Sequence, residues 1–151
     1  MANVYMAPSA IVTGDVILED GVNIWHGAVI RGDGGPIRIG ADTNIQDNCV
    51  IHEEVTVGKR CTIGHSAIVH GCTVGDDCVV GMGAILLNGA VLERHCIVGA
   101  GAVVTGKTHA PEGSMLLGNP AKIARQLTPE QIEYIHADAQ HYLELAEKYL
   151  K

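Results

Sequence analysis

The chain has 151 residues, with 10 basic and 17 acidic side chains and a formal net charge of −7 at neutral pH. This length allows one domain with a hydrophobic core, and the acidic balance argues against a surface for nucleic acid or an anionic membrane. No stretch contains the roughly 20 consecutive apolar residues that span a bilayer, and the N-terminus lacks the basic and apolar segments of a signal peptide. We therefore expect no nucleic-acid partner and no membrane partner.

Aliphatic residues recur every six positions along about two thirds of the chain. The period slips twice: three extra residues lie between Ile30 and Ile39, and one residue is missing between Val69 and Val74. A short period that persists over many repeats is typical of a solenoid. The recurring residues are Met6, Val12, Leu18, Ile24, Ile30, Ile39, Ile45, Ile51, Val57, Ile63, Val69, Val74, Val80, Leu86, Leu92, Val98 and Val104.

Each repeat predicts a short strand followed by a turn, because a small or branched residue precedes each aliphatic residue by two positions and Gly and Asp occur where the chain must bend. Three repeats make one triangular coil of 18 residues. Equivalent residues in successive coils then stack about 4.8 Å apart, the spacing of hydrogen-bonded strands. We expect residues 1–106 to form an all-β solenoid, a parallel β-helix of nearly six coils.

The five cysteines all occupy the small, inward-facing position of the repeat, and they are Cys49, Cys61, Cys72, Cys78 and Cys96. The same position also accepts Ala, Val and Thr, so we interpret these cysteines as small buried hydrophobic residues. The chain has no CxxC pair, which argues against a zinc knuckle. An odd number of buried thiols predicts a reducing, cytoplasmic location.

We expect the six-residue period to end after Val104, because the segment that follows is rich in Pro and Gly. We predict that residues 107–126 form a loop that connects the solenoid to the C-terminal segment. The Pro and Gly residues of this segment are Pro111, Gly113, Gly118 and Pro120.

Residues 127–151 predict a C-terminal amphipathic helix, with Thr128 as the N-cap, Pro129 at the first helical position and Gln131 completing a capping box. We expect this α-helix to pack along the solenoid or against a neighbouring subunit. His136 and His141 lie on it and are interpreted as surface residues.

The period places residues 18 positions apart on the same face in successive coils, and some of the histidines stack in ladders of this kind. His52 and His70 are 18 residues apart and follow equivalent aliphatic residues, so they stack one coil apart, with Arg31 one coil below. On another face, Asp47 and His65 are also 18 residues apart. Two imidazoles stacked at one strand spacing can share a metal ion.

A catalytic zinc site requires three protein ligands and an open position. His65 is the candidate third ligand, but it lies near a different edge of the triangle from His52 and His70 and should be too far away within one chain. A threefold assembly would bring the two edges together. The spacing therefore predicts metal sites at the interfaces of a homotrimer.

Simpler interpretations exist for isolated histidines. A single His at a β-helix corner is usually solvated or hydrogen-bonded, and we interpret His26, His95 and His109 in this way. Asp47 below His65 and Arg31 below His52 favour a site, because metal-bound imidazoles need neighbouring hydrogen-bond acceptors.

Four segments and a tail carry a resemblance to a known family. They are Arg31-Gly32-Asp33, Asn44-Ile45-Gln46-Asp47-Asn48, Ile51-His52, Ile63-Gly64-His65-Ser66-Ala67-Ile68-Val69-His70-Gly71, and Gly118-Asn119-Pro120-Ala121-Lys122. Together these segments resemble the γ-class carbonic anhydrases of the short-loop type. The resemblance implies a left-handed hexapeptide-repeat β-helix, and a trimer in which His52 and His70 of one subunit and His65 of the next bind the metal.

The resemblance also implies roles for neighbouring residues. Arg31 and Asp47 resemble a pair that joins adjacent subunits by a salt bridge, and Asp33 is expected to join this interface network. Gln46 resembles the residue that orients a metal-bound hydroxide, which attacks carbon dioxide to give bicarbonate. Zn²⁺ is the first choice of metal, and three imidazoles also accept Fe²⁺ or Co²⁺.

The chain departs from the founding enzyme type in one respect. That type carries an acidic loop after the first ligand, with a Glu that shuttles protons, whereas here only Glu53 and Glu54 separate His52 from the next strand at Val55. Either Glu is a candidate proton carrier, and either is equally explained as a solvated turn residue. Asn88, one coil above His70, is a candidate pocket residue, although the missing residue before it shifts its register.

Two alternatives remain open. Many hexapeptide-repeat proteins are acyltransferases, and some short-loop relatives resemble coenzyme A thioesterases, but the insertion Gly34-Gly35-Pro36 is too short to form an acceptor loop. No serine lies in a G-x-S-x-G motif, so a serine nucleophile is not expected. The second alternative is a trimer that is stabilised by metal and catalytically weak.

Overall fold

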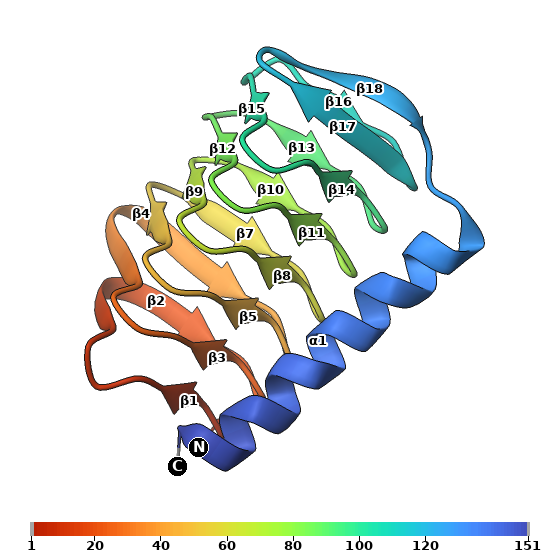
Figure 1. The fold of residues 1–151 in the computed structure, drawn as a ribbon. Coiled ribbons are helices and arrows are strands. Elements are labelled where there is room, and N and C mark those ends of the chain that lie inside the picture. The colour runs from red at the N-terminus through yellow and green to blue at the C-terminus, as the bar shows by residue number, and fades with distance from the viewer. Residues whose placement is uncertain (1, 151) are drawn as a thin grey trace.

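The six-residue period sets the register of a parallel β-solenoid of about six turns, followed by one C-terminal helix (Figure 1). The computed structural model describes residues 2–150. Residues one period apart in the sequence lie on neighbouring faces, on either side of a corner. Residues one coil apart pair in parallel strands: Ile30 pairs with Ile51, and Ile51 pairs with Val69. The predicted fold class is therefore confirmed.

The solenoid has three faces. The first, which we call the helix face, consists of β1 (Tyr5–Met6), β3 (Asn23–Ile24), β5 (Asn44–Ile45), β8 (Thr62–Ile63), β11 (Val79–Val80), β14 (Ile97–Val98) and β17 (Ser114–Gly118). The second, the histidine face, consists of the first parts of β2 (Ile11–Leu18) and β4 (Val29–Ile39), then β6 (Val50–His52), β9 (Ile68–His70), β12 (Ile85–Leu86) and β15 (Val103–Val104). The third face consists of the last parts of β2 and β4, then β7 (Val55–Val57), β10 (Thr73–Val74), β13 (Val91–Leu92) and β16 (His109–Ala110).

Both slips of the period are absorbed at one corner, where the histidine face meets the third face. The three extra residues lie within β4, which continues around this corner and pairs with β6 before it and with β7 after it. The missing residue shortens the same corner between β9 and β10, yet Val74 still pairs with Val57 and Leu92. The aliphatic register on the third face is therefore unbroken.

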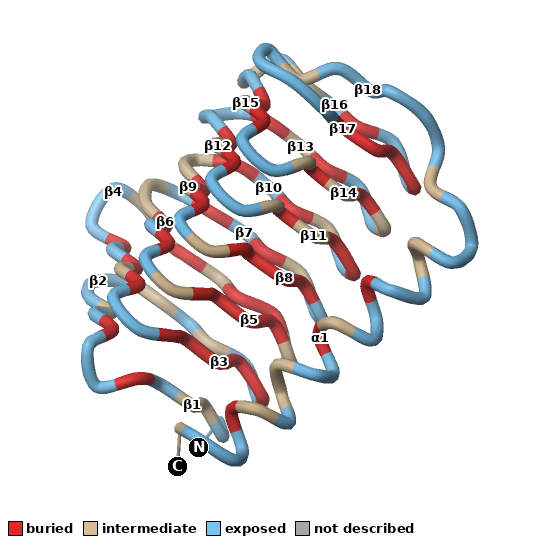
Figure 2. The backbone as a smooth tube through the Cα atoms, in the orientation of Figure 1, coloured by how far each residue is buried: buried red, intermediate tan, exposed pale blue. Residues whose placement is uncertain are grey.

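The interior is a narrow column of aliphatic and small side chains, and Figure 2 shows the buried segments of the stacked strands along it. The five cysteines are buried in this column and are free thiols, as predicted. Burial raises the pKa of Cys49 to about 11 and that of Cys72 to about 12. These two thiols therefore stay protonated at neutral pH and act as packing residues.

The prediction of a loop over residues 107–126 is wrong. The period continues for two more repeats, because Ala110 pairs with Leu92 and Leu116 pairs with Val98, and both side chains are fully buried. Pro111 and Gly113 lie at the corner between β16 and β17, where Gly113 has φ of 77°. The strand β17 then pairs in antiparallel fashion with β18 (Ala121–Gln126) at the C-terminal end of the column.

The predicted C-terminal helix is α1 (Pro129–Tyr149), and it runs along the solenoid (Figure 1). Thr128 and Gln131 form the expected capping box, with Pro129 at the start of the helix. The helix buries Ile135, Ala139 and Ala146, and it contacts β3, β5 and β8 of the helix face. Among residues 2–150, no helix is long and apolar enough to cross a membrane.

Two neighbouring leucines test whether the C-terminal strands belong to the core. Leu116 is fully buried, whereas Leu117 is 47% exposed. We expect Leu116→Ala to lower the free energy of unfolding by about 2–5 kcal/mol because it leaves a cavity in the column, and Leu117→Ala to change it by less than about 0.5 kcal/mol. Denaturant unfolding followed by circular dichroism would measure both. Equal, small effects would mean that β17 packs on the column without stabilising it.

Candidate metal centre

The His52 and His70 side chains meet at the corner between the histidine face and the third face. β4, β6 and β9 pair so that Arg31, His52 and His70 are consecutive members of one ladder, as the spacing predicts. Nδ1 of His52 lies 3.2 Å from Nε2 of His70, and the ring centroids are 5.1 Å apart. One strand spacing thus brings two imidazole nitrogens within reach of one ion.

The remaining nitrogen of each imidazole faces an oxygen. Nε2 of His52 lies 2.8 Å from Oδ1 of Asp33, and Nδ1 of His70 is hydrogen-bonded to Oδ1 of Asn88. An oxygen can only accept here, so each imidazole donates from that nitrogen and leaves the other with a free lone pair. The two free nitrogens face one another at 3.2 Å, close to the separation of about 3.3 Å that two nitrogen ligands have on a tetrahedral zinc ion.

Asp33 connects this pair to Arg31. Its second oxygen, Oδ2, accepts a hydrogen bond from Nη1 of Arg31. The hydrogen bond with His52, followed by that with Arg31, lowers the pKa of Asp33 below its ordinary value. Asp33 is therefore a carboxylate at neutral pH and a permanent acceptor for the His52 N–H.

His65 lies at a different corner, between the helix face and the histidine face. Its Nδ1 is 2.9 Å from Oδ2 of Asp47, whose Oδ1 accepts a hydrogen bond from the backbone N–H of His26. By the same argument, Nδ1 of His65 donates and Nε2 is free. The ligand atoms that cluster around His52 and His70 within the described chain do not include His65, in agreement with the expected separation.

Gln46 is buried between these elements and is held at both ends of its amide. Its Nε2 donates to Oδ1 of Asn44 at 3.1 Å, and its Oε1 accepts from the backbone N–H of His65 at 3.2 Å. Asn44 in turn donates to Oγ1 of Thr62. The Gln46 amide still has one N–H that is free to reach a ligand.

A hollow of about 270 Å³ opens beside Gln46 and His65, between the helix face and α1. Tyr134, Asp138 and Tyr142 of α1 line its outer wall. The hollow beside His65 is therefore lined by residues of the helix as well as residues of the solenoid.

The two candidate proton carriers differ in position. Oε1 of Glu53 lies 3.8 Å from Nδ1 of His52. Glu53, His52 and His70 each have a possible ligand atom within 4.8 Å of the other two, whereas Glu54 is exposed and has none in this cluster. A Cβ at Gly34 would lie 2.7 Å from the Glu53 carboxylate oxygens, so Gly34 leaves space for this side chain. Both glutamates line a polar hollow that also contains Asn88.

The structure thus gathers the predicted residues at two corners. The corner between the histidine face and the third face has Arg31, Asp33, His52, Glu53, His70 and Asn88. The corner between the helix face and the histidine face has Gln46, Asp47 and His65. Within the chain Arg31 pairs with Asp33, and Asp47 pairs with His65. Sequence reasoning missed Asn44, although its position two residues before Gln46 puts both side chains on the same side of the extended chain at β5 and the residue after it.

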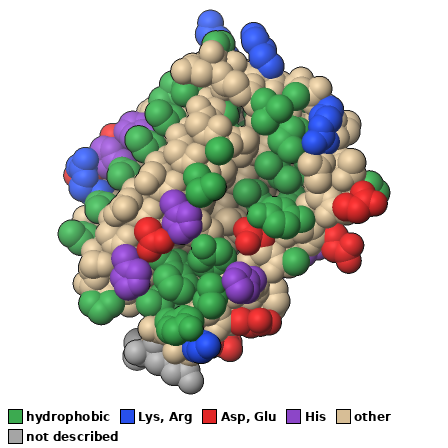
Figure 3. Space-filling model, in the orientation of Figure 1, with side chains coloured by type: hydrophobic (Ala, Val, Ile, Leu, Met, Phe, Trp, Pro, Cys, Tyr) green, Lys and Arg blue, Asp and Glu red, His purple; other side chains and the backbone are tan. Residues whose placement is uncertain are grey.

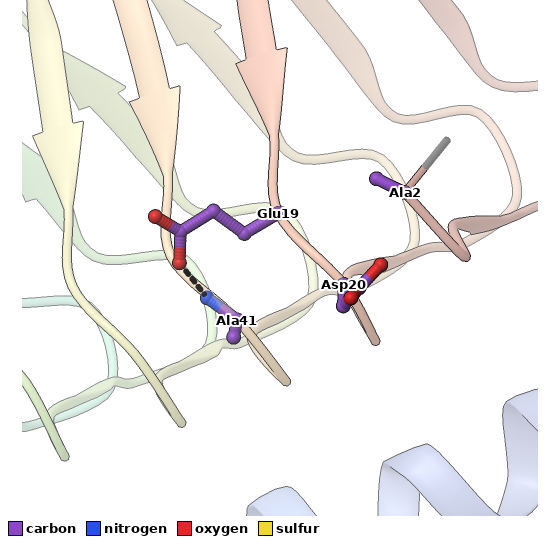
Figure 4. Close-up of a pocket in the computed structure, with 4 residues that line it drawn as sticks. All are labelled: Ala2, Glu19, Asp20 and Ala41. Atoms are coloured by element: carbon purple, nitrogen blue, oxygen red, sulfur yellow. Dashed lines mark hydrogen bonds between the residues drawn. The ribbon is translucent and has the colours of Figure 1, made fainter.

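Other surface features lie away from these corners. The open hollow in Figure 4 is lined by Ala2, Glu19, Asp20 and Ala41, and Glu19 accepts a hydrogen bond from the backbone N–H of Ala41 at 2.8 Å. It contains none of the predicted site residues. Figure 3 shows that histidine side chains lie beside acidic and basic side chains at the edge of the molecule.

Comparisons with known proteins place the chain among hexapeptide-repeat proteins. The family model described as the GMPPB C-terminal domain matches residues 34–132. The structure of a hexapeptide transferase family protein from Anaplasma phagocytophilum has a TM-score of 0.97 and 40% identity, over 99% of this chain and 91% of that one.

Two curated relatives are similar over nearly the whole chain. Gamma carbonic anhydrase 2, mitochondrial, from Arabidopsis thaliana is 48% identical over an alignment of 155 residues, gaps included, that covers 96% of this chain and 56% of that protein. The probable carbonic anhydrase of Methanocaldococcus jannaschii is 43% identical over an alignment of 149 residues that covers 96% of this chain and 94% of that protein. The chain therefore spans little more than half of the Arabidopsis relative.

Asn88 offers a test of the acceptors around the histidine pair. Asn88→Ala removes the oxygen that holds the His70 N–H, so we expect the affinity for Zn²⁺ or Co²⁺ to fall about 10–100-fold. Asn88→Asp keeps an acceptor at the same place and should retain tight binding. Competition with a chromophoric chelator would measure both affinities. An Asn88→Ala protein that binds metal as tightly as the unmodified protein would contradict the assignment.

Proposed function

Because this chain belongs to the γ carbonic anhydrase family, we propose that it catalyses the reversible hydration of carbon dioxide to bicarbonate at a metal centre shared between subunits of a homotrimer. Its repeats also belong to the domain family described as the GMPPB C-terminal domain. One observation carries the proposal: His52, His65 and His70 each hold one ring nitrogen against an oxygen and keep the other free.

The three free nitrogens are the proposed metal ligands, namely Nδ1 of His52, Nε2 of His70 and Nε2 of His65. Three neutral nitrogen donors suit Zn²⁺, which we propose as the metal, and also suit Fe²⁺ and Co²⁺. When bound by three neutral imidazoles, such an ion lowers the pKa of water to about 7 and so supplies a nucleophile at neutral pH. Asp33, Asn88 and Asp47 would keep the three imidazoles in the required tautomers.

The position of His65 supports the proposed homotrimer. The histidine face lies between the corner of His65 and the corner of His70, so a neighbouring subunit packed against this face can bring its His65 to the pair. A closed ring of such heterologous contacts gives cyclic symmetry. We propose that Arg31 then also reaches Asp47 of the next subunit, since half of the Arg31 side chain and a third of the Asp47 side chain are exposed in the single chain.

We propose distinct roles for the polar residues around the centre. Gln46 would use its remaining amide N–H to orient the attacking oxygen, because Asn44 and the His65 backbone fix the amide plane. Glu53 is the carboxylate nearest the pair and would accept the proton released during hydration, and the exposed Glu54 would pass it to solvent. Carbon dioxide is the proposed small-molecule partner.

The compartment is a proposal as well. Five buried free cysteines support a reducing, cytoplasmic location. The Arabidopsis relative is described as mitochondrial, so that relative lends no support to a cytoplasmic location.

The alternative function is acyl transfer or thioester hydrolysis with coenzyme A, which is favoured by the similarity to a protein of the hexapeptide transferase family from Anaplasma. The three extra residues of this chain lie within β4 and form no projecting acceptor loop in the described chain. Acyl transfer also requires one catalytic His and not three with matched acceptors. Carbon dioxide hydration therefore uses more of the observed geometry.

Stopped-flow measurement of carbon dioxide hydration on zinc-, cobalt- and anaerobically iron-loaded protein tests the proposed activity. We expect metal-dependent hydration, and we expect His70→Ala to lower it at least about 100-fold because one ligand is lost. Metal bound stoichiometrically without hydration for any of the three ions would overturn the activity, and coenzyme A thioesters would then be tested.

Mixed trimers test the sharing of the centre between subunits. A subunit with His65→Ala still has His52 and His70, and a subunit with His70→Ala still has His65. We expect each variant to be inactive alone, and refolding them together at equal amounts to restore about a quarter of the sites, as random assortment in a cyclic trimer requires. Recovery of no activity from mixed trimers would exclude a site shared in this way.

A further inference from the structure

A second histidine cluster lies at the corner between the third face and the helix face. Asp77 and His95 occupy successive coils of the solenoid there, and His136 reaches them from α1. His95 was expected to be a solvated or hydrogen-bonded corner residue and His136 a surface residue. The side chain of His95 is 11% exposed, that of His136 is 49% exposed and that of Asp77 is 1% exposed. Because α1 runs along the solenoid (Figure 1), this cluster joins the helix to the repeats.

One possible ligand atom of each of the three side chains lies within 4.8 Å of the other two. Nε2 of His95 lies 3.2 Å from Nε2 of His136, Nε2 of His136 lies 3.4 Å from Oδ1 of Asp77, and Nε2 of His95 lies 3.9 Å from Oδ2 of Asp77. Ligand atoms on a tetrahedral zinc ion with bonds of about 2.0–2.1 Å are separated by about 3.3 Å. Small side-chain rotations would therefore bring all three atoms onto one ion.

Neighbouring residues hold two of these side chains in place. Arg60 donates to both oxygens of Asp77, at 2.8 and 3.0 Å, which fixes the carboxylate plane. Oε1 of Glu112 lies 3.4 Å from Nδ1 of His95, so that nitrogen is placed to donate and Nε2 to keep a free lone pair. A metal-binding imidazole has this arrangement when a carboxylate accepts its second N–H.

The surrounding charges permit a cation. Two guanidiniums approach the cluster, Arg60 and Arg94, and Arg94 lies 3.9 Å from Asp77 and 3.6 Å from Glu112. The carboxylates of Asp77 and Glu112 offset both positive charges. An entering divalent ion would therefore meet two imidazoles and a carboxylate beside guanidiniums whose charges are offset.

We propose that Asp77, His95 and His136 form a second zinc site, which fastens α1 to the solenoid. Two His and one carboxylate leave the fourth tetrahedral position to water. None of these residues belongs to the two corners that would meet in the proposed trimer, so each subunit would carry this site complete. The proposal therefore does not depend on the carbonic anhydrase activity.

Metal stoichiometry tests the site on the full chain. Chelated, metal-free protein is titrated with Zn²⁺ by calorimetry, and the bound metal is then counted by elemental analysis. We expect a second equivalent of Zn²⁺ per chain beyond the equivalent at the shared centre. His136→Gln should remove this second equivalent alone, whereas His141→Gln, a matched change of an exposed histidine on the same helix, should retain it.

Hydrogen exchange of α1 provides an independent measurement. Zn²⁺ should slow exchange of the α1 amides at least about 10-fold in the unmodified protein and in His141→Gln, but not in His136→Gln. A folded His136→Gln protein that binds as many equivalents of Zn²⁺ as the unmodified protein would overturn the proposal, whether that number is one or two per chain. This outcome would leave His95 and His136 as a hydrogen-bonded pair.

Discussion

The parallel hydrogen bonding between successive coils is the constraint on which the rest of this structure depends. The backbone N–H of Gly71 donates to the carbonyl of His52 at 3.0 Å, and that of Gly89 donates to Gly71 at 2.9 Å. These bonds fix equivalent residues at one strand spacing whatever their side chains are. The narrow column inside then admits small residues such as Cys72, and the corners outside are free to carry polar ladders.

Much of this arrangement can be predicted from the sequence, because a constant period makes the separation of two residues in the sequence determine their relative position in the solenoid. The stacking of His52 on His70 needs only their separation of 18 residues and an unbroken coil between them. The strands β16, β17 and β18 were not predicted, because Pro and Gly are typical both of a corner of the solenoid and of a loop. Pro111 and Gly113 suggested that the repeats had ended, whereas they bend the chain between two further buried residues, Ala110 and Leu116.

The oxygen acceptors of the histidine pair were harder to predict, for a related reason. Asp33 borders the three-residue insertion within β4, and Asn88 follows the point where the period loses one residue. Spacing fixes position only between slips, so neither side chain could be assigned to a particular ring nitrogen in advance. Asp47 has no slip between it and His65, and its contact with that imidazole was foreseen.

Stacking alone can supply only two ligands to a metal ion. Neighbouring residues on one ladder are about 4.8 Å apart, so residues two coils apart are separated by about 10 Å. This is well beyond the separation of two ligand atoms on one zinc ion. A third ligand must come from outside the ladder. At the corner of His52 and His70 that ligand would be His65 of a neighbouring subunit, and at the corner of Asp77 and His95 it would be His136 of α1. A two-residue ladder in this fold therefore gains a further nitrogen ligand where another element covers its corner.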